Sequence, residues 1–197
     1  MHRRDRCRRR SYAERSAHER DTYTNSEVPR ARSSYNPGVI PGPVAIRSAQ
    51  REDLPAILAL YSEGTLNSAQ QSEYLTGSDA YAQAFDAIAA DPNNHVYVAE
   101  RDGRVVGTFQ LTFIRQLSYG GGLVAQVESV FVGSAQRSGG VGAAMMQFAR
   151  AEAERRGAFR IQLTSNVARE RAHRFYERLG YQASHKGMKL YLGAGTK

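Results

Sequence analysis

Apolar and polar positions recur with two different periods along residues 44–192, and these periods separate expected strands from expected helices. Apolar runs typical of strands lie at 44–49, 95–100, 105–114, 123–132 and 159–165. Apolar residues at helical spacing predict helices over 52–63, 80–91, 141–157 and 169–180. The last apolar run, 181–192, predicts a closing pair of strands. The order β-α-α-β-β-β-α-β-α-β-β indicates an α/β fold with a mixed sheet and helices on both faces.

Turn residues stand between these elements. Asp102-Gly103 joins two strand patterns directly, so residues 95–114 are expected to form a β-hairpin. The glycines at 120–122 predict a second turn, and Gly180 suits the left-handed position after the last helix. The residues expected on the apolar face of helix 141–157 are Val141, Met145, Phe148 and Ala151.

The first 43 residues differ in composition from the rest of the chain. They hold ten Arg and five acidic residues, and so carry most of the net charge of +8. Their apolar content is too low to build a core, so we expect a disordered, Arg-rich tail over 1–43 and one folded domain over 44–197. The prolines of residues 36–43 mark the boundary. The tail leaves contact with nucleic acid or an acidic partner open, although a solvated extension is favoured.

Composition excludes several classes of protein. No apolar run approaches the roughly 18–20 residues of a membrane span, and no apolar segment follows the N-terminal arginines as in a secretory signal. Cys7 is the only cysteine, which excludes an internal disulfide or a cysteine-ligated metal. The scattered histidines suggest no metal site either. A cytoplasmic protein without a metal and without membrane contact is expected.

Residues 135–146, AQRSGGVGAAMM, place three glycines just before a predicted helix. Each glycine costs the helix about 1 kcal/mol relative to Ala. A backbone without side chains is therefore needed here for a reason other than helix stability. The first turn of a helix has unpaired N–H groups and attracts anions, and glycines let a phosphate approach them. The pattern of Arg137, Gly140 and Gly142 favours a phosphate site over an ordinary flexible loop.

Two familiar phosphate motifs do not match. A P-loop ends in Gly-Lys-Ser/Thr, whereas this loop continues Gly-Ala-Ala. The dinucleotide fingerprint needs a third glycine where Met145 stands and an acidic residue near Gln162. A nucleotide-bearing cofactor of another kind remains.

The span VESVFVGSAQRSGGVGAAMM resembles the signature of the GNAT superfamily of N-acetyltransferases, and LTSNVARERAHRFYERLGYQASHKGMKL resembles the second half of many bacterial members. The resemblance runs from Val44 to Leu192. It implies a mostly antiparallel central sheet, splayed between the fourth and fifth strands. It also implies transfer of the acetyl group of acetyl-CoA to a primary amine of a small-molecule or peptide acceptor. Members often form dimers, and the closing segment SHKGMKLYL is the candidate contact for a homodimer.

The resemblance also assigns the cofactor site. The residues expected to hold the pyrophosphate of acetyl-CoA are Arg137, Ser138, Gly139, Gly140, Val141, Gly142 and Ala143. The backbone of Val130, Phe131 and Val132 is expected to pair with the pantetheine arm, with the amide near Val130 polarising the thioester carbonyl. Asn166 is expected to contact the pantetheine, and a helix cap is an equally good interpretation of this residue.

Acetyl transfer to an amine needs a group that takes the amine proton, because an alkyl amine is protonated at pH 7. Removing that proton costs roughly 4–5 kcal/mol. Glu128 interrupts the strand 123–132, which is expected to be covered on both faces. It could instead pair with an arginine at the sheet edge or stand exposed at a strand bulge. The family implication favours Glu128 as the base, acting directly, through water, or by holding the amine.

The departing thiolate needs a proton, and Tyr176 is the candidate acid because a phenol is uncharged at neutral pH. Helical periodicity by itself favours a core tyrosine at this position. The resemblance reverses that preference, since a tyrosine here commonly approaches the CoA sulfur.

The acceptor is not readable from the sequence. The polar stretch 64–79 and the turn around Tyr119 are expected to wall its pocket, and Glu63 and Glu73 would favour a cationic amine. Two other functions stay open: a nucleic-acid-binding or regulatory protein acting through the Arg-rich tail, and a catalytically silent CoA-binding module. Nucleic acid is not the expected partner, because a solvated tail is favoured.

Overall fold

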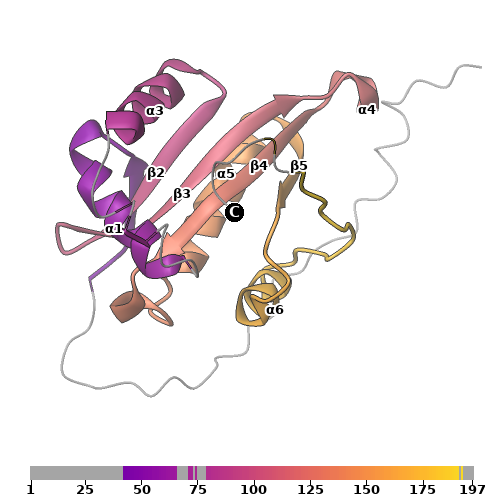
Figure 1. The fold of residues 1–197 in the computed structure, drawn as a ribbon. Helices are drawn as coiled ribbons and strands as arrows, with labels where there is room; N and C mark the ends of the chain where they lie inside the picture. Colours follow the sequence, from indigo (N-terminus) through magenta and orange to yellow (C-terminus); the bar gives the residue numbers. More distant parts are fainter. Residues whose placement is uncertain (1–41, 66–70, 73, 75–78, 191, 193–197) are drawn as a thin grey trace, which may run out of the picture. The chain divides into compact units, whose positions relative to one another are not determined.

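In the computed structural model, which describes residues 42–65, 71–72, 74, 79–190 and 192, five strands form one sheet (Figure 1). The strands are β1 (Ala45–Ser48), β2 (Asn94–Arg101), β3 (Arg104–Arg115), β4 (Leu123–Val132) and β5 (Ala158–Leu163). They lie side by side in sequence order. The pairs from β1 to β4 are antiparallel, and β4 and β5 are parallel. The mixed, mostly antiparallel sheet expected from the sequence is confirmed.

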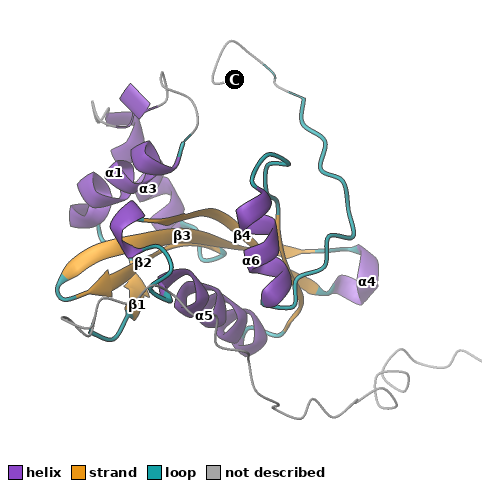
Figure 2. Ribbon diagram, turned by 90° about the horizontal axis from the view of Figure 1, so that it is seen from below, coloured by secondary structure: helices purple, strands orange, loops and turns teal. Residues whose placement is uncertain are grey.

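Helices cover both faces of this sheet. They are α1 (Leu54–Gly64), α3 (Asp79–Ala90), the single turn α4 (Ser118–Gly121), α5 (Val141–Arg155) and α6 (Glu170–Arg178). Figure 2 shows α1 and α3 on one side of the strands and α5 on the other. None of the helices among the described residues is long and apolar enough to cross a membrane.

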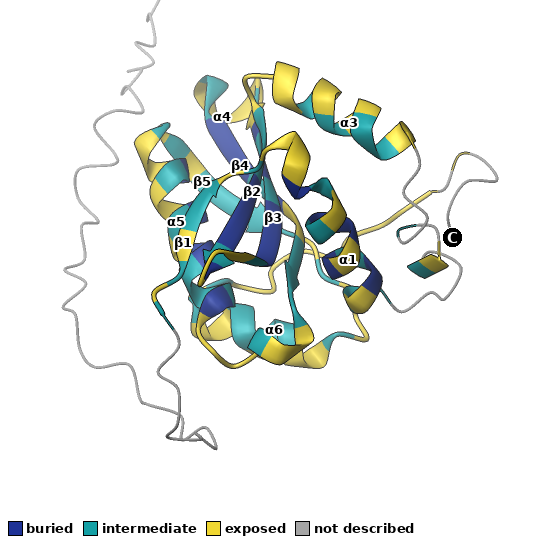
Figure 3. Cartoon of the chain, turned by 90° about the vertical axis from the view of Figure 1, so that its left-hand side faces the viewer, coloured by how far each residue is buried: buried dark blue, intermediate teal, exposed yellow. Residues whose placement is uncertain are grey.

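The main core lies between the sheet and α5. Figure 3 shows buried residues concentrated in β2, β3 and β4, and exposed residues along α3. On α5 the buried side chains include Val141, Met145, Ala149 and Ala153, at a constant spacing of four residues. The prediction for Val141 and Met145 is confirmed. The prediction for Ala151 is wrong, because this residue lies on the exposed side of the helix.

The predicted hairpin is present. Asp102 and Gly103 both have positive φ, +51° and +71°, which is the geometry of the two-residue turn whose twist matches antiparallel strands. The turn at 120–122 is also present, with Gly120 and Gly121 at positive φ.

The fourth and fifth strands separate partway along the sheet. Their pairing runs from Leu123–Ala158 to Val127–Leu163 and stops there, while β4 continues to Val132. Beyond this point β4 is paired only with β3. One extra residue enters β4 near Ser129, whose φ is +51°, so the strand forms a β-bulge. The predicted splay is confirmed, and it begins next to Glu128.

The predicted closing strand pair is wrong for the described residues. Residues 181–190 and Leu192 have no regular secondary structure. Met188, Leu190 and Leu192 follow the two-residue period of a strand, yet they are 88%, 85% and 92% exposed. Periodicity marks a segment that suits a strand, but a strand forms only when it is paired, and within the described residues this segment pairs with no strand. The predicted tail lies almost entirely outside the described residues, as do Glu73 and most of the stretch 64–79.

Candidate active site

The glycine loop joins the free end of β4 to α5. Gly140 is the N-cap of α5, has a φ of +80°, and no side chain caps the helix. The first backbone hydrogen bond of the helix runs from the Ala144 N–H to the Gly140 carbonyl. Among the described residues, the N–H groups of residues 140–143 therefore have no partner. Unpaired N–H groups at the positive end of a 15-residue helix can bind an anion.

The three glycines of the loop are needed for three different reasons. Gly140 takes a left-handed conformation that other residues adopt only with strain. A Cβ on Gly142 would lie 3.2 Å from the ring of Phe175, so glycine there lets α6 pack on α5. A Cβ on Gly139 would lie 3.1 Å from Nη1 of Arg101, which is buried beneath the loop. The sequence indicated that the loop needs residues without side chains, but it did not show that Phe175 and Arg101 are the neighbours that require this.

Arg137 is exposed beside the loop, and its Nε donates to the carbonyl of Val132 at 3.2 Å. The Gly133 N–H donates to Val106 of β3. Because backbone groups of a strand alternate in direction, those of Phe131 also face β3, and those of Val130 and Val132 face the opposite edge. That edge is the one from which β5 has departed.

Glu128 is exposed, so the expectation of a strand covered on both faces is wrong at this point. The cause is local: β5 pairs with β4 only as far as Val127, and the bulge at Ser129 follows immediately. The exposed position at a strand bulge, one of the two structural alternatives, describes the geometry. No ion pair holds the Glu128 carboxylate among the described residues, so it is available to a ligand.

The last turn of α1 holds the splayed half of β4. The Tyr61 hydroxyl is hydrogen-bonded to the Ser129 side chain, and its ring lies 4.8 Å from that of Phe131. Burial raises the pKa of Tyr61 to about 12, although the bond to Ser129 opposes the shift. The Glu63 carboxylate accepts the Ser134 N–H at 2.9 Å, so this acid serves the start of the glycine loop. Gly64 lies directly against the Phe131 ring.

These contacts were not foreseen from the sequence. Tyr61 was recognisable only as an apolar position of helix 52–63. Nothing in its spacing links it to Ser129, which is 68 positions away in the chain. A possible signal is the glycine at position 64, since a glycine within a helix often marks a close approach by another group.

Arg169 connects α6 to the same turn of α1. Its Nη2 donates to the carbonyl of Gly64 at 2.9 Å. Tyr176, two helix turns further on, is half-buried against the core, with its ring 5.1 Å from Phe175 and 5.8 Å from Tyr181. Burial raises the pKa of Tyr176, and the charge of Arg169 opposes the shift. The phenol therefore keeps its proton at neutral pH.

Asn166 forms the turn that precedes α6. Its Oδ1 accepts the Ala168 N–H, and its carbonyl accepts the Arg169 N–H, both at 2.9 Å. The N-cap of α6 is Arg169, so Asn166 is a turn residue and not the cap itself. Its side-chain oxygen is engaged within the chain.

The structure thus links several of these residues around the point where β4 leaves β5. Contacts run from the bulge beside Glu128 to Tyr61 and from Gly64 to Arg169, and the charge of Arg169 acts on the Tyr176 phenol. The glycine loop follows directly at the end of β4. Tyr119 is set apart: it packs against Phe159 at 5.3 Å, at the other end of β4. In the part of the chain that the structure describes, no group of three or more His, Cys, Asp or Glu side chains could hold a metal ion.

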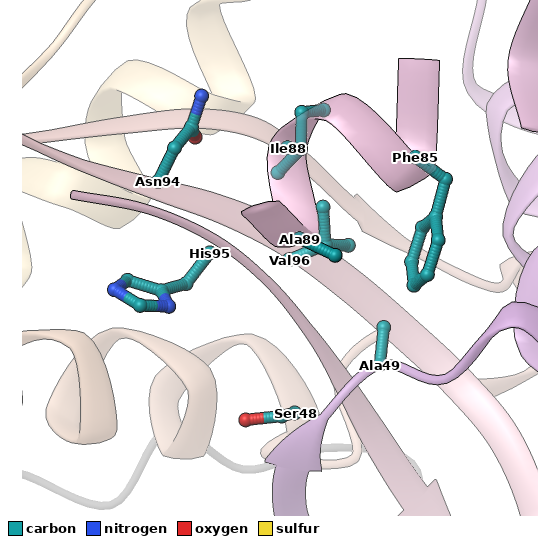
Figure 4. Close-up of a pocket in the computed structure, with 8 residues that line it drawn as sticks. All are labelled: Ser48, Ala49, Phe85, Ile88, Ala89, Asn94, His95 and Val96. Carbon is teal, nitrogen blue, oxygen red and sulfur yellow. The ribbon is translucent and has the colours of Figure 1, made fainter. Parts of the chain in front are cut away.

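A pocket of about 220 Å³ lies elsewhere, between α3 and the start of β2 (Figure 4). Phe85, Ile88 and Ala89 supply its apolar wall, and Asn94 and His95 its polar side. None of the residues predicted for the cofactor or for catalysis lines it. The pocket therefore does not belong to the site built around β4.

Comparison with known proteins places this geometry in context. Residues 55–181 match the acetyltransferase (GNAT) family. The aminoalkylphosphonate N-acetyltransferase of Salmonella typhimurium is 32% identical over 140 residues, which make up 71% of this chain and 86% of that protein.

Solved structures share the fold. The crystal structure of a transcriptional regulator from Bacillus halodurans C-125 has a TM-score of 0.71 and 36% identity, and covers 76% of this chain and 99% of its own. The structure of AAC(6')-Iy in complex with the bisubstrate analog CoA-S-monomethyl-acetylneamine has a TM-score of 0.63 at 14% identity, covering 78% and 100%. At that identity the likeness concerns the fold alone.

Proposed function

The chain belongs to the acetyltransferase (GNAT) family, and from that premise we propose that it transfers the acetyl group of acetyl-CoA to a primary amine by direct attack. The observation that carries the proposal is the row of unpaired N–H groups from Gly140 to Ala143, at the end of the strand that has lost its neighbour. These groups would bind the diphosphate of the coenzyme. Arg137 lies beside them and adds a positive charge.

The open edge of β4 would hold the pantetheine arm. The backbone groups of Val130 and Val132 face that edge, and the amide near Val130 would donate to the thioester carbonyl. Acetyl-CoA would supply an activated acyl group with a thiol as the leaving group. An N–H donor aimed at the carbonyl oxygen stabilises the negative charge that develops there in the transition state.

Two side chains would move protons. The Glu128 carboxylate takes a proton from the acceptor amine, directly or through a water molecule, while the nitrogen bonds to the carbonyl carbon. The carbon–sulfur bond then breaks, and the Tyr176 phenol gives its proton to the departing sulfur. The raised pKa of Tyr176 supports this role, because the phenol is fully protonated before the reaction.

The acceptor would be a small amine. A relative at 32% identity is named for aminoalkylphosphonates, which places amines that carry an anionic group first among the candidates. Peptide amines are the second class to test. We would assay CoA release with aminoalkylphosphonates, amino acids, aminoglycosides and lysine peptides, and acetylation of one of these classes is the expected result.

Binding of the coenzyme is tested separately by titration calorimetry with CoA. We expect heat of association from the full chain. A chain that binds no CoA would overturn the proposed function, whereas a chain that binds CoA but acetylates no amine would point to the silent CoA-binding module. Deletion of residues 1–43 distinguishes the remaining alternative, because a function carried by the Arg-rich tail would disappear while acetyl transfer remained.

We also propose that two copies pair through the segment that follows α6. Within the described residues, β5 is the last strand of the sheet, and nothing pairs with its outer edge. Met188, Leu190 and Leu192 form an exposed apolar row with strand periodicity. The row from one copy, laid along β5 of the other, would satisfy both the unpaired edge and the exposed apolar side chains.

A further inference from the structure

Arg101 is buried directly beneath the glycine loop. It is the last residue of β2 and is 8% exposed. Its Nη1 donates to Oε1 of Gln136 at 2.9 Å, and its Nη2 donates to the carbonyl of Gly139 at 2.8 Å. Both acceptors are neutral. The Nε atom is buried and has no hydrogen-bond partner among the residues that the structure describes.

The charge of Arg101 is not balanced by a carboxylate. Seven ion pairs join the described residues, and Arg101 takes part in none of them. A buried guanidinium is normally paired with an acid, since removing a charge from water is costly. A positive charge kept without a partner next to a row of unpaired N–H groups favours an anion on the other side of the loop.

The bond to Gly139 also sets the direction of the loop's donors. The peptide between Gly139 and Gly140 is trans, so its carbonyl and its N–H point in opposite directions. Because the Gly139 carbonyl points at Arg101, the Gly140 N–H must point away from it, toward the outer side of the loop. Arg101 thereby fixes the first of the free donors that run from Gly140 to Ala143.

We propose that Arg101 is a positioning residue for the diphosphate of acetyl-CoA: it orients the Gly139–Gly140 peptide from below and adds a buried positive charge behind the loop. This inference rests on the proposed function. It predicts a defect specific to the diphosphate, because the described hydrogen bonds of the Arg101 side chain go to Gln136 and Gly139 and none goes to β4 or to the residues proposed to move protons.

The test compares Arg101→Gln with Arg104→Gln. The two arginines face each other across the hairpin, and Arg104 is exposed, so both variants lose the same charge from the same turn. We expect Arg101→Gln to weaken CoA binding by about 10- to 100-fold in titration calorimetry and to raise KM for acetyl-CoA in proportion, with kcat within about threefold of the wild type. Arg104→Gln should change KM less than about twofold, as expected for an exposed charge.

Truncated thioesters locate the effect. S-acetylpantetheine lacks the nucleotide and the diphosphate, so Arg101→Gln and the wild type should use it equally well. The acetyl thioester of dephospho-CoA keeps the diphosphate but lacks the 3′-phosphate, so the defect should persist with it. An equal defect with S-acetylpantetheine, or no defect with acetyl-CoA, would overturn the inference. A wild type that does not bind acetyl-CoA would instead remove the proposed function.

A second variant tests the same contact in case Arg101→Gln does not fold. If Arg101→Gln melts below the assay temperature, Gly139→Ala perturbs the same contact from the other side, because its Cβ would lie 3.1 Å from Nη1 of Arg101. Gly139 does not have positive φ, so alanine can adopt its backbone angles, and its Cβ would also lie 3.1 Å from the backbone oxygen of Gln136. The same loss with acetyl-CoA and the same use of S-acetylpantetheine are expected. Unchanged kinetics would count against Arg101.

Discussion

At the scale of single residues, the carboxylate of Glu128 is accessible to a ligand because of its place in the sheet, and burial has no part in this. It stands exposed beside a bulge, where a strand has one free edge and a ligand can reach both the carboxylate and the backbone. Tyr176 shows the reverse, since its proton is kept by burial against the core. The proposed base is exposed and the proposed acid is half-buried, so replacing each of them should have different consequences for the rest of the chain.

We expect Glu128→Gln to lower kcat by about 10²- to 10⁴-fold, the usual contribution of a general base, with little change in thermal stability.

Tyr176→Phe should lower kcat by about tenfold or more. Because burial raises the pKa of Tyr176, the phenol stays protonated past its ordinary value near 10, and no loss of activity from its ionisation is expected below that pH. Steady-state kinetics from pH 6 to 10, with calorimetric CoA binding as control, checks both. Unchanged turnover in either variant would remove that residue from the mechanism.

At the scale of elements, the last turn of α1 is the support of the active half of β4. After Val127, β4 is no longer paired with β5. There the residues 61–64 contact β4 and the loop that follows it, through the hydroxyl contact to Ser129, the ring packing on Phe131 and the carboxylate that accepts the Ser134 N–H. The bulge at Ser129 sets the direction of the Val130 amide. The helix would therefore act on the proposed reaction through the strand.

Tyr61→Phe keeps the ring packing and removes the hydroxyl contact to Ser129. Loss of one hydrogen bond is worth about 1 kcal/mol, and we expect kcat to fall by about three- to tenfold while KM for acetyl-CoA changes little. Tyr119→Phe is the matched control, since Tyr119 is exposed and packs on Phe159 at the other end of β4. Equal effects of the two variants would contradict a role for the Ser129 contact.

The end of α5 carries a pH-sensitive contact. Glu152 accepts hydrogen bonds from Arg155 and Arg156, and these bonds lower its pKa from 4.5 to about 2. A lowered folded pKa means that the contribution to stability is complete above pH 4.5 and is lost as the pH falls toward 2. We expect Glu152→Gln to lower the melting temperature at pH 7 by a few degrees and to reduce the difference between pH 7 and pH 3. Glu154→Gln, at an exposed carboxylate, is the control and should change neither.

Local patterns predicted most elements but few of the contacts between them. Hydrophobic period and turn chemistry were sufficient for the hairpin at Asp102-Gly103 and for α5, because those features are decided by neighbours in the chain. The exposure of Glu128 depends on where β5 ends, which no local pattern contains. The support from Tyr61 and the guanidinium of Arg101 depend on contacts between residues 35 or more positions apart, so only the folded chain shows them.

At the scale of the whole molecule, the sheet ends in an unpaired edge, and the segment after α6 ends in an unpaired apolar row. An exposed strand edge invites pairing with another chain. In a single chain Met188, Leu190 and Leu192 are exposed to water. Burying each of these side chains would contribute about 1.5–3 kcal/mol of favourable free energy. Association of two copies recovers that free energy twice, once for each segment.

Leu190→Asp should therefore turn a dimer into a monomer. The wild type is expected to elute at twice the mass of one chain in light-scattering chromatography, and the variant at the mass of one chain, because a charge would enter the apolar row. Lys189→Ser is the control: it changes the neighbouring residue, which a strand would direct to the other side. Since Leu190 is 85% exposed within its own chain, its replacement should leave the fold of that chain intact, as circular dichroism would verify. A monomeric wild type, or a dimer unaffected by Leu190→Asp, would exclude this interface and return the segment to solvent.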